Sequence, residues 1–340
     1  MTKRKYLIVL IPTFIIASVV GNFTEKSVRI WIEKVYAVVL GKPMVYDITQ
    51  TDERGVPFII ESTIGKQRNP VTVCNRALGY YNKFRQGDSS QLILFLNCSD
   101  WLIENLTRKN NYAMLPYNYN WPNYHMTAPW RSGLANGVSL QVFVKAHEAT
   151  GDQKYVVAAK QILNSFFVDV KDGGVTYLSN DRGWWFEELS DNNGYVSRVL
   201  NGHMFALLGI HDYFIYTHDS AANYLFKQGL LGLKNNLPKY DIGDGHSFYD
   251  LVGTPANVKY HLIHIDLLDR IFKITGDPVY RFYSDKWSKY KFPSLTTRLV
   301  TDPKRIDFAI WLVNFVVVLV IVGMSVFWYT RKARARQANR

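Results

Sequence analysis

The sequence contains only two cysteines, Cys74 and Cys98, among its 340 residues. They leave open either one disulfide in an oxidising compartment or two buried free thiols. The sequence also lacks the C-x-x-C, H-E-x-x-H, G-x-S-x-G and Walker-loop motifs. These absences leave little basis for a metal centre, a serine hydrolase or a nucleotide-dependent function, and we predict no metal site.

Acidic residues are fewer than basic ones, and the formal net charge is +12. Eight basic residues lie near the two ends of the chain: Lys3, Arg4, Lys5, Arg331, Lys332, Arg334, Arg336 and Arg340. The excess is therefore mainly a membrane-topology signal, with a mild remaining bias towards an anionic partner. No basic run is interleaved with aromatic residues, so we predict no nucleic-acid partner.

Two apolar segments near the ends predict membrane attachment. Residues 1–24 begin with a basic cluster followed by an apolar run and have no clean small-x-small cleavage site, so we predict a retained anchor. Residues 306–330 form a longer apolar run, followed by the basic tail 331–340, and this pattern predicts a transmembrane helix. By the positive-inside rule both termini are cytoplasmic, and the region between the two segments is extracytoplasmic.

The intervening region is predicted to be mainly α. Residues 25–69 read as a connector helix followed by a small β-hairpin around Asp52–Gly55. Apolar stripes at helical spacing then predict about seven to nine helices from Pro70 to Tyr290. The pattern helix, Thr-Gly-Asp, two residues, Tyr, helix occurs twice, at residues 147–155 and 272–280. Such short-loop helix pairs predict an α/α toroid, or incomplete α/α barrel, over residues 70–300.

An aromatic segment interrupts the helical pattern between residues 112 and 133. It contains three prolines and the aromatic residues Tyr117, Tyr119, Trp121, Tyr124 and Trp130. Flat aromatic faces pack on sugar rings while their polar tips stay hydrated, so we predict that this loop lines a groove.

Five sequence blocks carry a resemblance to a known family. They read PWRSGLANGVSLQVFVKAHEATGD, GWWFEELS, VLNGHMFALLGIHDY, LPKYDIGDGHSFYDL and KYHLIHIDLL. In this order and spacing they resemble the C-terminal domain of the glucuronyl C5-epimerases, which convert D-glucuronate to L-iduronate within heparosan or heparan-type chains. The resemblance implies an isomerase that acts on a uronate-containing polysaccharide or glycan. It implies no organic cofactor, because the substrate's own carboxylate acidifies the C5 proton.

The resemblance also implies the proton-handling residues. Tyr249 and Tyr260 match the family's active-site tyrosines. Leu189 stands where the family has a further tyrosine, and Val252 stands where it has an arginine. An insertion supplies Tyr195 and Arg198. These two side chains either replace the missing phenol and cation, as we propose, or belong to a solvated loop without a role in the site.

Further residues of the same blocks are predicted to bind the substrate: Glu187, Glu188, Asn201, His261, His264, Trp130 and Trp185. Strand alternation directs only one of Glu187 and Glu188 inwards, and we favour Glu188. His261 and His264 share one helix face, where they either bind the uronate or hold Tyr260, or else form a capping or core pair. Two other functions stay open at this stage, a uronate lyase and a non-catalytic glycan-binding protein.

Overall fold

The computed structural model describes residues 3–39, 50–61, 64–121, 123–178, 183–194 and 196–338. The chain divides into two compact units, Val45–Tyr290 and a second unit formed by Met1–Met44 with Lys291–Arg340. Residues 291–300, which we expected to complete the toroid, therefore belong to the second unit.

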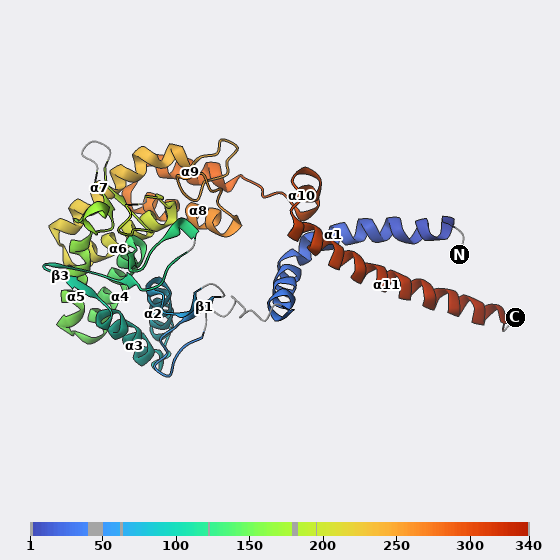
Figure 1. Ribbon diagram of the computed structural model, residues 1–340, viewed down its shortest axis with the longest axis horizontal. Helices are drawn as coiled ribbons and strands as arrows, with labels where there is room; N and C mark the ends of the chain where they lie inside the picture. Colours follow the sequence, from blue (N-terminus) through green and yellow to red (C-terminus); the bar gives the residue numbers. More distant parts are fainter. Residues whose placement is uncertain are drawn as a thin grey trace. The chain divides into compact units, whose positions relative to one another are not determined.

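The larger unit contains eight α-helices within its described residues, as the sequence predicted. They are α2 (Pro70–Arg85), α3 (Gln91–Glu104), α4 (Gly133–Thr150), α5 (Gln153–Ser165), α6 (Leu200–Thr217), α7 (Ser220–Asn236), α8 (Val258–Thr275) and α9 (Pro278–Ser288). Consecutive helices pack as the pairs α2–α3, α4–α5, α6–α7 and α8–α9. The first helix of each pair also packs on the first helix of the next pair, so α2, α4, α6 and α8 form an inner row (Figure 1). The mainly α, incomplete α/α barrel is thereby confirmed.

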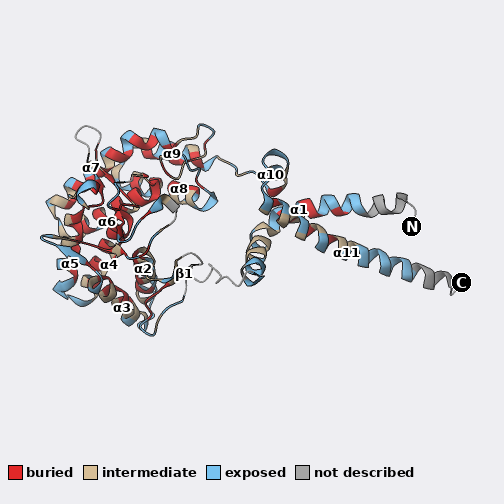
Figure 2. Cartoon of the chain, viewed as in Figure 1, coloured by how far each residue is buried: buried red, intermediate tan, exposed pale blue. Residues whose placement is uncertain are grey.

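The middle of the inner row is the core of this unit. Residues of α4 and α6 are buried on nearly all sides, as Figure 2 shows. Gly137 and Gly209 allow the two helices to touch, because a Cβ at Gly209 would lie 1.9 Å from the backbone oxygen of Gly137. By contrast, α2 and α8 at the two ends of the row do not pack together comparably, and the barrel stays open between them.

The Thr-Gly-Asp connections form as the sequence predicted. Gly151 and Gly276 adopt left-handed backbone conformations, with φ of 71° and 69°, and the aspartate after each accepts a hydrogen bond from the start of the next helix. The α6–α7 connection repeats this geometry with His218 at φ 56° and Asp219 as the cap. The sequence analysis did not recognise this connection as a third copy of the repeat, because a histidine replaces the glycine.

Four antiparallel two-stranded ribbons complete the larger unit. They are β1 (Ile59–Glu61) with β2 (Gly65–Gln67), β3 (Thr107–Lys109) with β4 (Tyr112–Met114), β5 (Pro116–Tyr117) with β6 (Trp130–Arg131), and β7 (Thr176–Tyr177) with β8 (Trp185–Phe186). Short 3-10 turns occupy Asn123–His125, Val170–Asp172 and Leu237–Tyr240.

The hairpin predicted around Asp52–Gly55 is only partly correct. A turn forms there and is closed by a single bridge between Thr51 and Pro57, but the paired strands are β1 and β2 further along the chain. Most of the first predicted strand falls in residues 40–49, outside the described residues.

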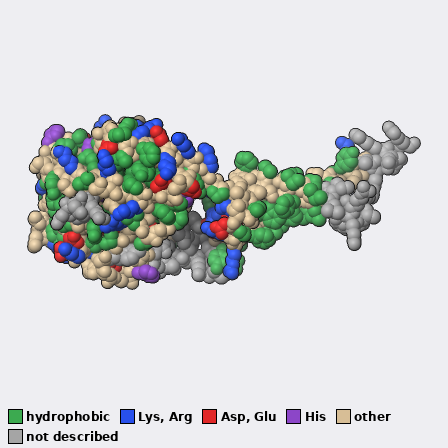
Figure 3. Space-filling view, turned by 90° about the horizontal axis from the view of Figure 1, so that it is seen from above, with side chains coloured by type: hydrophobic (Ala, Val, Ile, Leu, Met, Phe, Trp, Pro, Cys, Tyr) green, Lys and Arg blue, Asp and Glu red, His purple; other side chains and the backbone are tan. Residues whose placement is uncertain are grey.

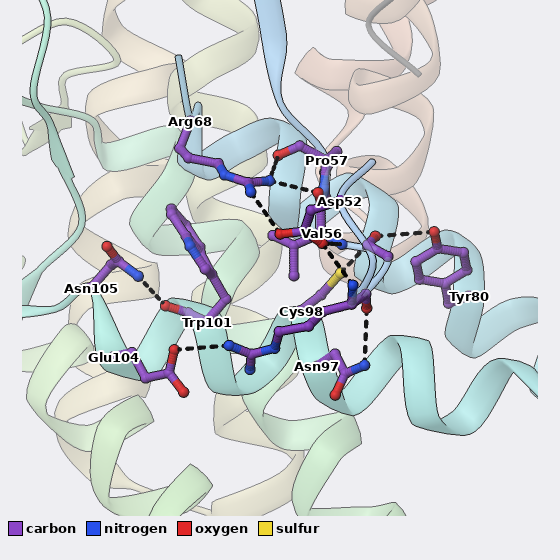
Figure 4. A network of polar contacts seen from close by, with 12 residues as sticks. Asp52, Val56, Pro57, Arg68, Tyr80, Asn97, Cys98, Trp101, Glu104 and Asn105 are labelled. Carbon is purple, nitrogen blue, oxygen red and sulfur yellow. Dashed lines mark hydrogen bonds and ion pairs between the residues drawn. The ribbon is translucent and has the colours of Figure 1, made fainter. Parts of the chain in front are cut away.

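The turn is fixed to α2 and α3 by polar contacts (Figure 4). Arg68 donates to Asp52 at 2.6 Å and to the carbonyl of Val56 at 2.6 Å, and Tyr80 donates to the carbonyl of Gly55 at 3.1 Å. The cysteines lie nearby as two buried free thiols, so the disulfide alternative is wrong. Burial raises the pKa of the Cys98 thiol to about 12, and this thiol is therefore neutral and unreactive.

The second unit consists of α1 (Lys3–Val39), α10 (Leu295–Thr301) and α11 (Arg305–Ala338). Polar contacts join α1 to α11: Thr24 donates to Asn314 at 2.7 Å, and Trp311 donates to Ser18 at 3.1 Å. Apolar side chains gather on the surface of these helices (Figure 3).

Among the described residues, Arg305–Lys332 is the one helical segment that is long and apolar enough to cross a membrane. This finding agrees with the C-terminal prediction by length and composition. The helix α1 continues without a break past residue 24. The N-terminal anchor and the membrane topology stay predictions.

Candidate functional site

A cavity of about 440 Å³ lies at the open side of the barrel. Its walls come from the start of α2, the aromatic segment between β5 and β6, the segment after β8, and the start of α8. Among its lining residues are Trp130, Glu188, Asn201, Tyr249 and Tyr260, which the sequence analysis had singled out. The fold therefore brings together residues that are up to 130 positions apart in the sequence.

The aromatic segment forms one wall, as predicted. Tyr117 and Trp130 face each other across the β5–β6 pair with ring centroids 3.7 Å apart and nearly parallel. Tyr119 packs edge-on against Trp130 at 6.0 Å, and the Trp130 ring nitrogen donates to the Tyr119 carbonyl at 2.9 Å. Trp121 and Tyr124 also line the cavity. The wall is thus an ordered aromatic surface of the kind that packs against a sugar ring.

Tyr249 and Tyr260 lie side by side in the lining of the cavity, with ring centroids 4.7 Å apart. Tyr260 occupies the first turn of α8, and its backbone N–H donates to the capping side chain of Asn257 at 3.1 Å. Burial and the neighbouring Glu188 carboxylate raise the pKa of both phenols, while a hydrogen bond with Tyr249 lowers that of Tyr260. Both phenols are consequently protonated at neutral pH.

Glu188 is the carboxyl group of the cavity. Burial raises its pKa to about 7 from an ordinary 4.5. Asn201 donates to its Oε2 atom at 3.4 Å, while the Oδ1 atom of Asn201 is buried without a partner among the described residues. Gly202 provides the space, because a Cβ there would lie 2.4 Å from Glu188 Oε2. Glu188 can therefore exchange a proton near neutral pH.

Glu187 is fully buried and does not line the cavity, whereas Glu188 does. The Oε2 atom of Glu187 accepts the backbone N–H of Arg198 at 3.0 Å, and burial raises the pKa of this carboxyl to about 8. Trp185 is 2% exposed and stacks on His203 with ring centroids 4.0 Å apart. Glu187 and Trp185 were predicted to contact the substrate; the structure buries both side chains, Trp185 within β8 and Glu187 directly after it, and neither lines the cavity.

The predicted histidine pair also lies in the core. Ser247 contacts the Nδ1 atoms of both His261 and His264, at 2.9 and 3.0 Å, and His261 Nε2 lies 3.0 Å from the carbonyl of Trp287. Burial lowers the pKa of His264 to about 3, so this ring is neutral. The structure thus places both rings in the core, where α8 turns this face towards α9.

Arg198 does not supply the predicted cation to the cavity. Its backbone has φ 51°, and its guanidinium lies over the ring of Tyr177, 4.6 Å from the centroid. Its carbonyl accepts the hydroxyl of Tyr240 at 2.5 Å. These contacts hold Arg198 outside the cavity wall. Tyr195, its predicted companion, lies outside the described residues.

The two departures from the family pattern fall at different places. Leu189 lines the cavity and is 5% exposed, so an apolar side chain replaces a phenol inside the site. Val252 is 52% exposed and does not line the cavity. Lys259 is the only lysine or arginine among the described residues that form the lining.

The sequence analysis missed Lys259 in the lining of this site and Asp250 beside it. Lys259 directly precedes Tyr260, and its ammonium lies 5.4 Å from the Tyr260 ring centroid. Tyr124, with φ 70°, donates to the buried carboxylate of Asp250 at 2.5 Å. Asp250 also accepts the backbone N–H groups of Val252 and Thr254, and these bonds fix the turn after Tyr249. The sequence could have indicated both residues, because Asp250 directly follows Tyr249 and Lys259 directly precedes Tyr260.

No group of three or more histidine, cysteine or acidic side chains with metal-binding geometry occurs in the described part of the chain. The site is best characterised as one carboxyl group, one tyrosine pair and one lysine around an aromatic-walled cavity.

Sequence comparisons agree with this geometry. Residues 109–289 match the family described as D-glucuronyl C5-epimerase C-terminus. The chain is 37% identical over 174 residues to the uncharacterized protein MJ1128 of Methanocaldococcus jannaschii, covering 50% of this chain and 56% of that protein. It is 30% identical over 221 residues to the D-glucuronyl C5-epimerase of Caenorhabditis elegans, covering 58% of this chain and 35% of that protein. The matches thus span about half of one relative and a third of the other.

Solved structures show a similar fold at low identity. A sugar epimerase from a ruminal bacterium aligns with a TM-score of 0.53 and 11% identity, covering 77% of this chain and 73% of that one. Cellobiose 2-epimerase from Bacillus thermoamylovorans aligns with a TM-score of 0.50 and 12% identity, covering 76% and 71%. The match over residues 109–289, which is more than half of the chain, shows that the chain belongs to the family of the D-glucuronyl C5-epimerase C-terminal domain.

Proposed function

We propose that this protein is a glucuronyl C5-epimerase-like isomerase that converts D-glucuronate to L-iduronate residues in a surface polysaccharide or glycan. The observation that carries the proposal is the position of Glu188, a carboxyl group with a pKa near neutrality, in the same aromatic-walled cavity as Tyr249 and Tyr260.

The reaction sets three requirements for the site. The C5 proton is alpha to a carboxylate, so its removal builds negative charge on a group that is already anionic. A base must take the proton from one face of the sugar, and an acid must return a proton to the other face. A cation or hydrogen-bond donor must stabilise the carboxylate while the charge develops.

The contact between Tyr249 and Tyr260 changes the roles suggested by the sequence. Rings with centroids 4.7 Å apart leave no room for a sugar between them, so the two phenols act from the same face. We assign the base to Glu188, because its pKa of about 7 suits proton abstraction near neutral pH. The protonated tyrosine pair then returns a proton from the other face.

The proton balance closes over one turnover. Glu188 gains the C5 proton, and one phenol loses a proton to C5 from the opposite face. The resulting tyrosinate regains a proton and the Glu188 carboxyl releases one, both by exchange with water. In the reverse direction the two groups exchange roles.

The remaining wall supports binding of a uronate. Lys259 is the cation of the lining and would contact the carboxylate of the substrate. The faces of Trp121 and Tyr124 would carry the sugar ring, with Asn201 available to a hydroxyl group.

Deuterium exchange at C5 tests the proposal. The purified full chain is incubated in D2O with heparosan, a polymer that contains glucuronate, and deuterium at C5 is followed by NMR. We expect exchange together with the appearance of iduronate, and we expect Glu188→Gln to abolish both.

Two other results would refute the proposal in distinguishable ways. Ultraviolet absorbance from an unsaturated uronate would identify a lyase, in which the group at C4 leaves after the proton. Binding of heparosan without any exchange would identify a glycan-binding protein. That second result would fit the leucine and valine at positions 189 and 252, where the family has a tyrosine and an arginine.

A further inference from the structure

The insertion that follows Ser190 is fastened to the aromatic segment of the cavity wall. Asp191, its first residue, is fully buried. The Oδ2 atom of Asp191 accepts the backbone N–H of Thr127 at 3.2 Å and the Thr127 hydroxyl at 3.1 Å. Thr127 directly follows Met126, whose backbone is joined to that of Trp121 by two hydrogen bonds of 2.9 Å. The insertion therefore holds the base of the Trp121–Met126 hairpin.

Two neighbours of Asp191 extend this connection. The Nδ2 atom of Asn193 donates to Asp191 Oδ2 at 2.9 Å and lies 3.3 Å from the Thr127 hydroxyl oxygen. Asn192 accepts a hydrogen bond from the Arg131 guanidinium at 2.8 Å. The backbone N–H of Asn193 donates to the other oxygen of Asp191 at 2.9 Å. A carboxylate suits this position because it accepts several hydrogen bonds and donates none.

A buried cation lies close to Asp191. Arg131 belongs to β6, and its backbone pairs with Ser190 through hydrogen bonds of 2.7 and 3.0 Å. Burial lowers the pKa of the Arg131 guanidinium, while the charge of Asp191 raises it. The attraction between the two groups offsets part of the cost of burying them. The aromatic segment and the insertion are thus joined by charge as well as by hydrogen bonds.

A second buried carboxylate holds the same hairpin at Tyr124. The Tyr124 hydroxyl donates to Asp250 Oδ2 at 2.5 Å, and Asp250 is fully buried. Tyr124 and His125 have φ of 70° and 54°, which residues other than glycine rarely adopt. Such backbone conformations persist where the surrounding contacts enforce them. Asp250 at Tyr124 and Asp191 at Thr127 supply contacts of this kind.

The two carboxylates belong to the segments that carry the proton-handling groups. Asp191 follows Glu188 by three residues, and Asp250 directly follows Tyr249. The hairpin that would carry the sugar ring is therefore hydrogen-bonded to the segment of the base and to the segment of the tyrosine pair. A sugar that packs on the hairpin is held at a defined distance from both groups, as proton transfer at C5 requires.

We propose that Asp191 is a positioning residue for sugar binding. It acts through Thr127, which holds the aromatic faces of Trp121 and Tyr124 in the cavity wall. Asp191 itself does not line the cavity, so it would hold the wall without touching the sugar. The inference rests on the proposed function and gives the first residues of the insertion a role in substrate binding.

The test compares Asp191→Ala with the control Asp88→Ala. Asp88 also accepts a backbone N–H and a hydroxyl, both from Ser90, but it lies in the exposed connection between α2 and α3. Calorimetry on the full chain in mild detergent gives the affinity for heparosan, and C5 exchange on the same polymer gives KM and kcat. Backbone hydrogen exchange of residues 119–131 is followed by mass spectrometry.

We expect Asp191→Ala to bind heparosan at least about tenfold more weakly and to show a similar rise in KM. A hairpin that keeps its binding geometry for about a tenth of the time lowers the apparent affinity by that fraction. The value of kcat should change less than about threefold, because the bound state still has the native geometry. Amides of residues 119–131 should exchange at least about tenfold faster than in the wild type. Asp88→Ala should match the wild type in each measurement.

Unchanged affinity and KM in Asp191→Ala would overturn the positioning role. A fall in kcat at constant KM would also overturn it, because the effect would then lie in proton transfer. A role confined to stability would lower the melting temperature and leave the affinity of the folded protein unchanged.

Thr127→Val provides a second variant if Asp191→Ala does not fold. It keeps the side-chain volume and the backbone N–H but removes the hydroxyl donor, so heparosan affinity should fall about threefold. Added to Asp191→Ala, it should have no further effect, because the hydroxyl has already lost its acceptor. Unchanged affinity in Thr127→Val, or additive losses in the double variant, would contradict the proposed contact.

The binding measurements keep the two proposals separable, because they do not require turnover. If the wild-type protein binds heparosan but exchanges no deuterium, the proposed function fails and the role of Asp191 is judged by affinity and backbone exchange. If C5 exchange proceeds and Asp191→Ala matches the wild type, the positioning role fails and the proposed function stands. A wild-type protein that neither binds heparosan nor exchanges its C5 proton would overturn both.

Discussion

Replacing Glu188 by glutamine should stabilise the protein and abolish its activity. Burial raises the pKa of the Glu188 carboxyl from 4.5 to about 7 in the folded protein. Between these values the folded protein keeps the proton while the unfolded chain loses it, so the free energy of unfolding falls as the pH rises. Since one pKa unit corresponds to about 1.36 kcal/mol, the ionised carboxylate costs the folded state roughly 3 kcal/mol above pH 7.

Glutamine has nearly the same shape and can still accept the hydrogen bond from Asn201, but it does not ionise. We expect the free energy of unfolding of Glu188→Gln to equal that of the wild type at or below about pH 4.5. Its excess over the wild type should grow between about pH 4.5 and 7 and reach up to about 3 kcal/mol at about pH 8. Wild-type C5 exchange should rise with pH up to about 7 and then level off, since the base must be ionised. In Glu188→Gln it should fall at least about 100-fold at every pH.

The assay is urea denaturation of the full chain in mild detergent, followed by tryptophan fluorescence at each pH. The control is Glu104→Gln, because that side chain is 55% exposed at the protein surface. A gain in stability that is independent of pH would refute the raised pKa of the Glu188 carboxyl. Retained C5 exchange in Glu188→Gln would refute the role of Glu188 as the base.

Three further predictions concern the tyrosine pair, the lysine and the membrane topology. Tyr260→Phe keeps the ring and removes the hydroxyl, so the melting temperature should change little while exchange falls about 100-fold; normal exchange in the double variant with Tyr249→Phe would exclude the pair as proton donors. Lys259→Gln should raise KM for the uronate at least about tenfold, whereas Lys259→Arg should retain most of the affinity, and equal KM values would exclude the carboxylate contact. Protease added to intact cells should digest the region from 50 to 290 and spare a C-terminal tag, and loss of the tag would refute the predicted topology.

Local features of the sequence determined most of the fold. Helix boundaries followed from apolar spacing and from turn chemistry within a few neighbouring residues, as at Gly151 and Asp152. The aromatic segment was recognisable because five large rings near three prolines suit neither a helix nor a solvated loop. The five blocks, in their order and spacing, were sufficient to identify the family.

Only the tertiary structure decided which side chains share the cavity. Arg198 and Lys259 are both cations near matching blocks, yet Arg198 lies over Tyr177 while Lys259 lines the cavity. His261 and Tyr260 are adjacent in the sequence, but α8 turns the histidine towards Ser247 and the core. Residue order and spacing fix the elements, whereas the direction of each side chain depends on how those elements rotate and pack against one another.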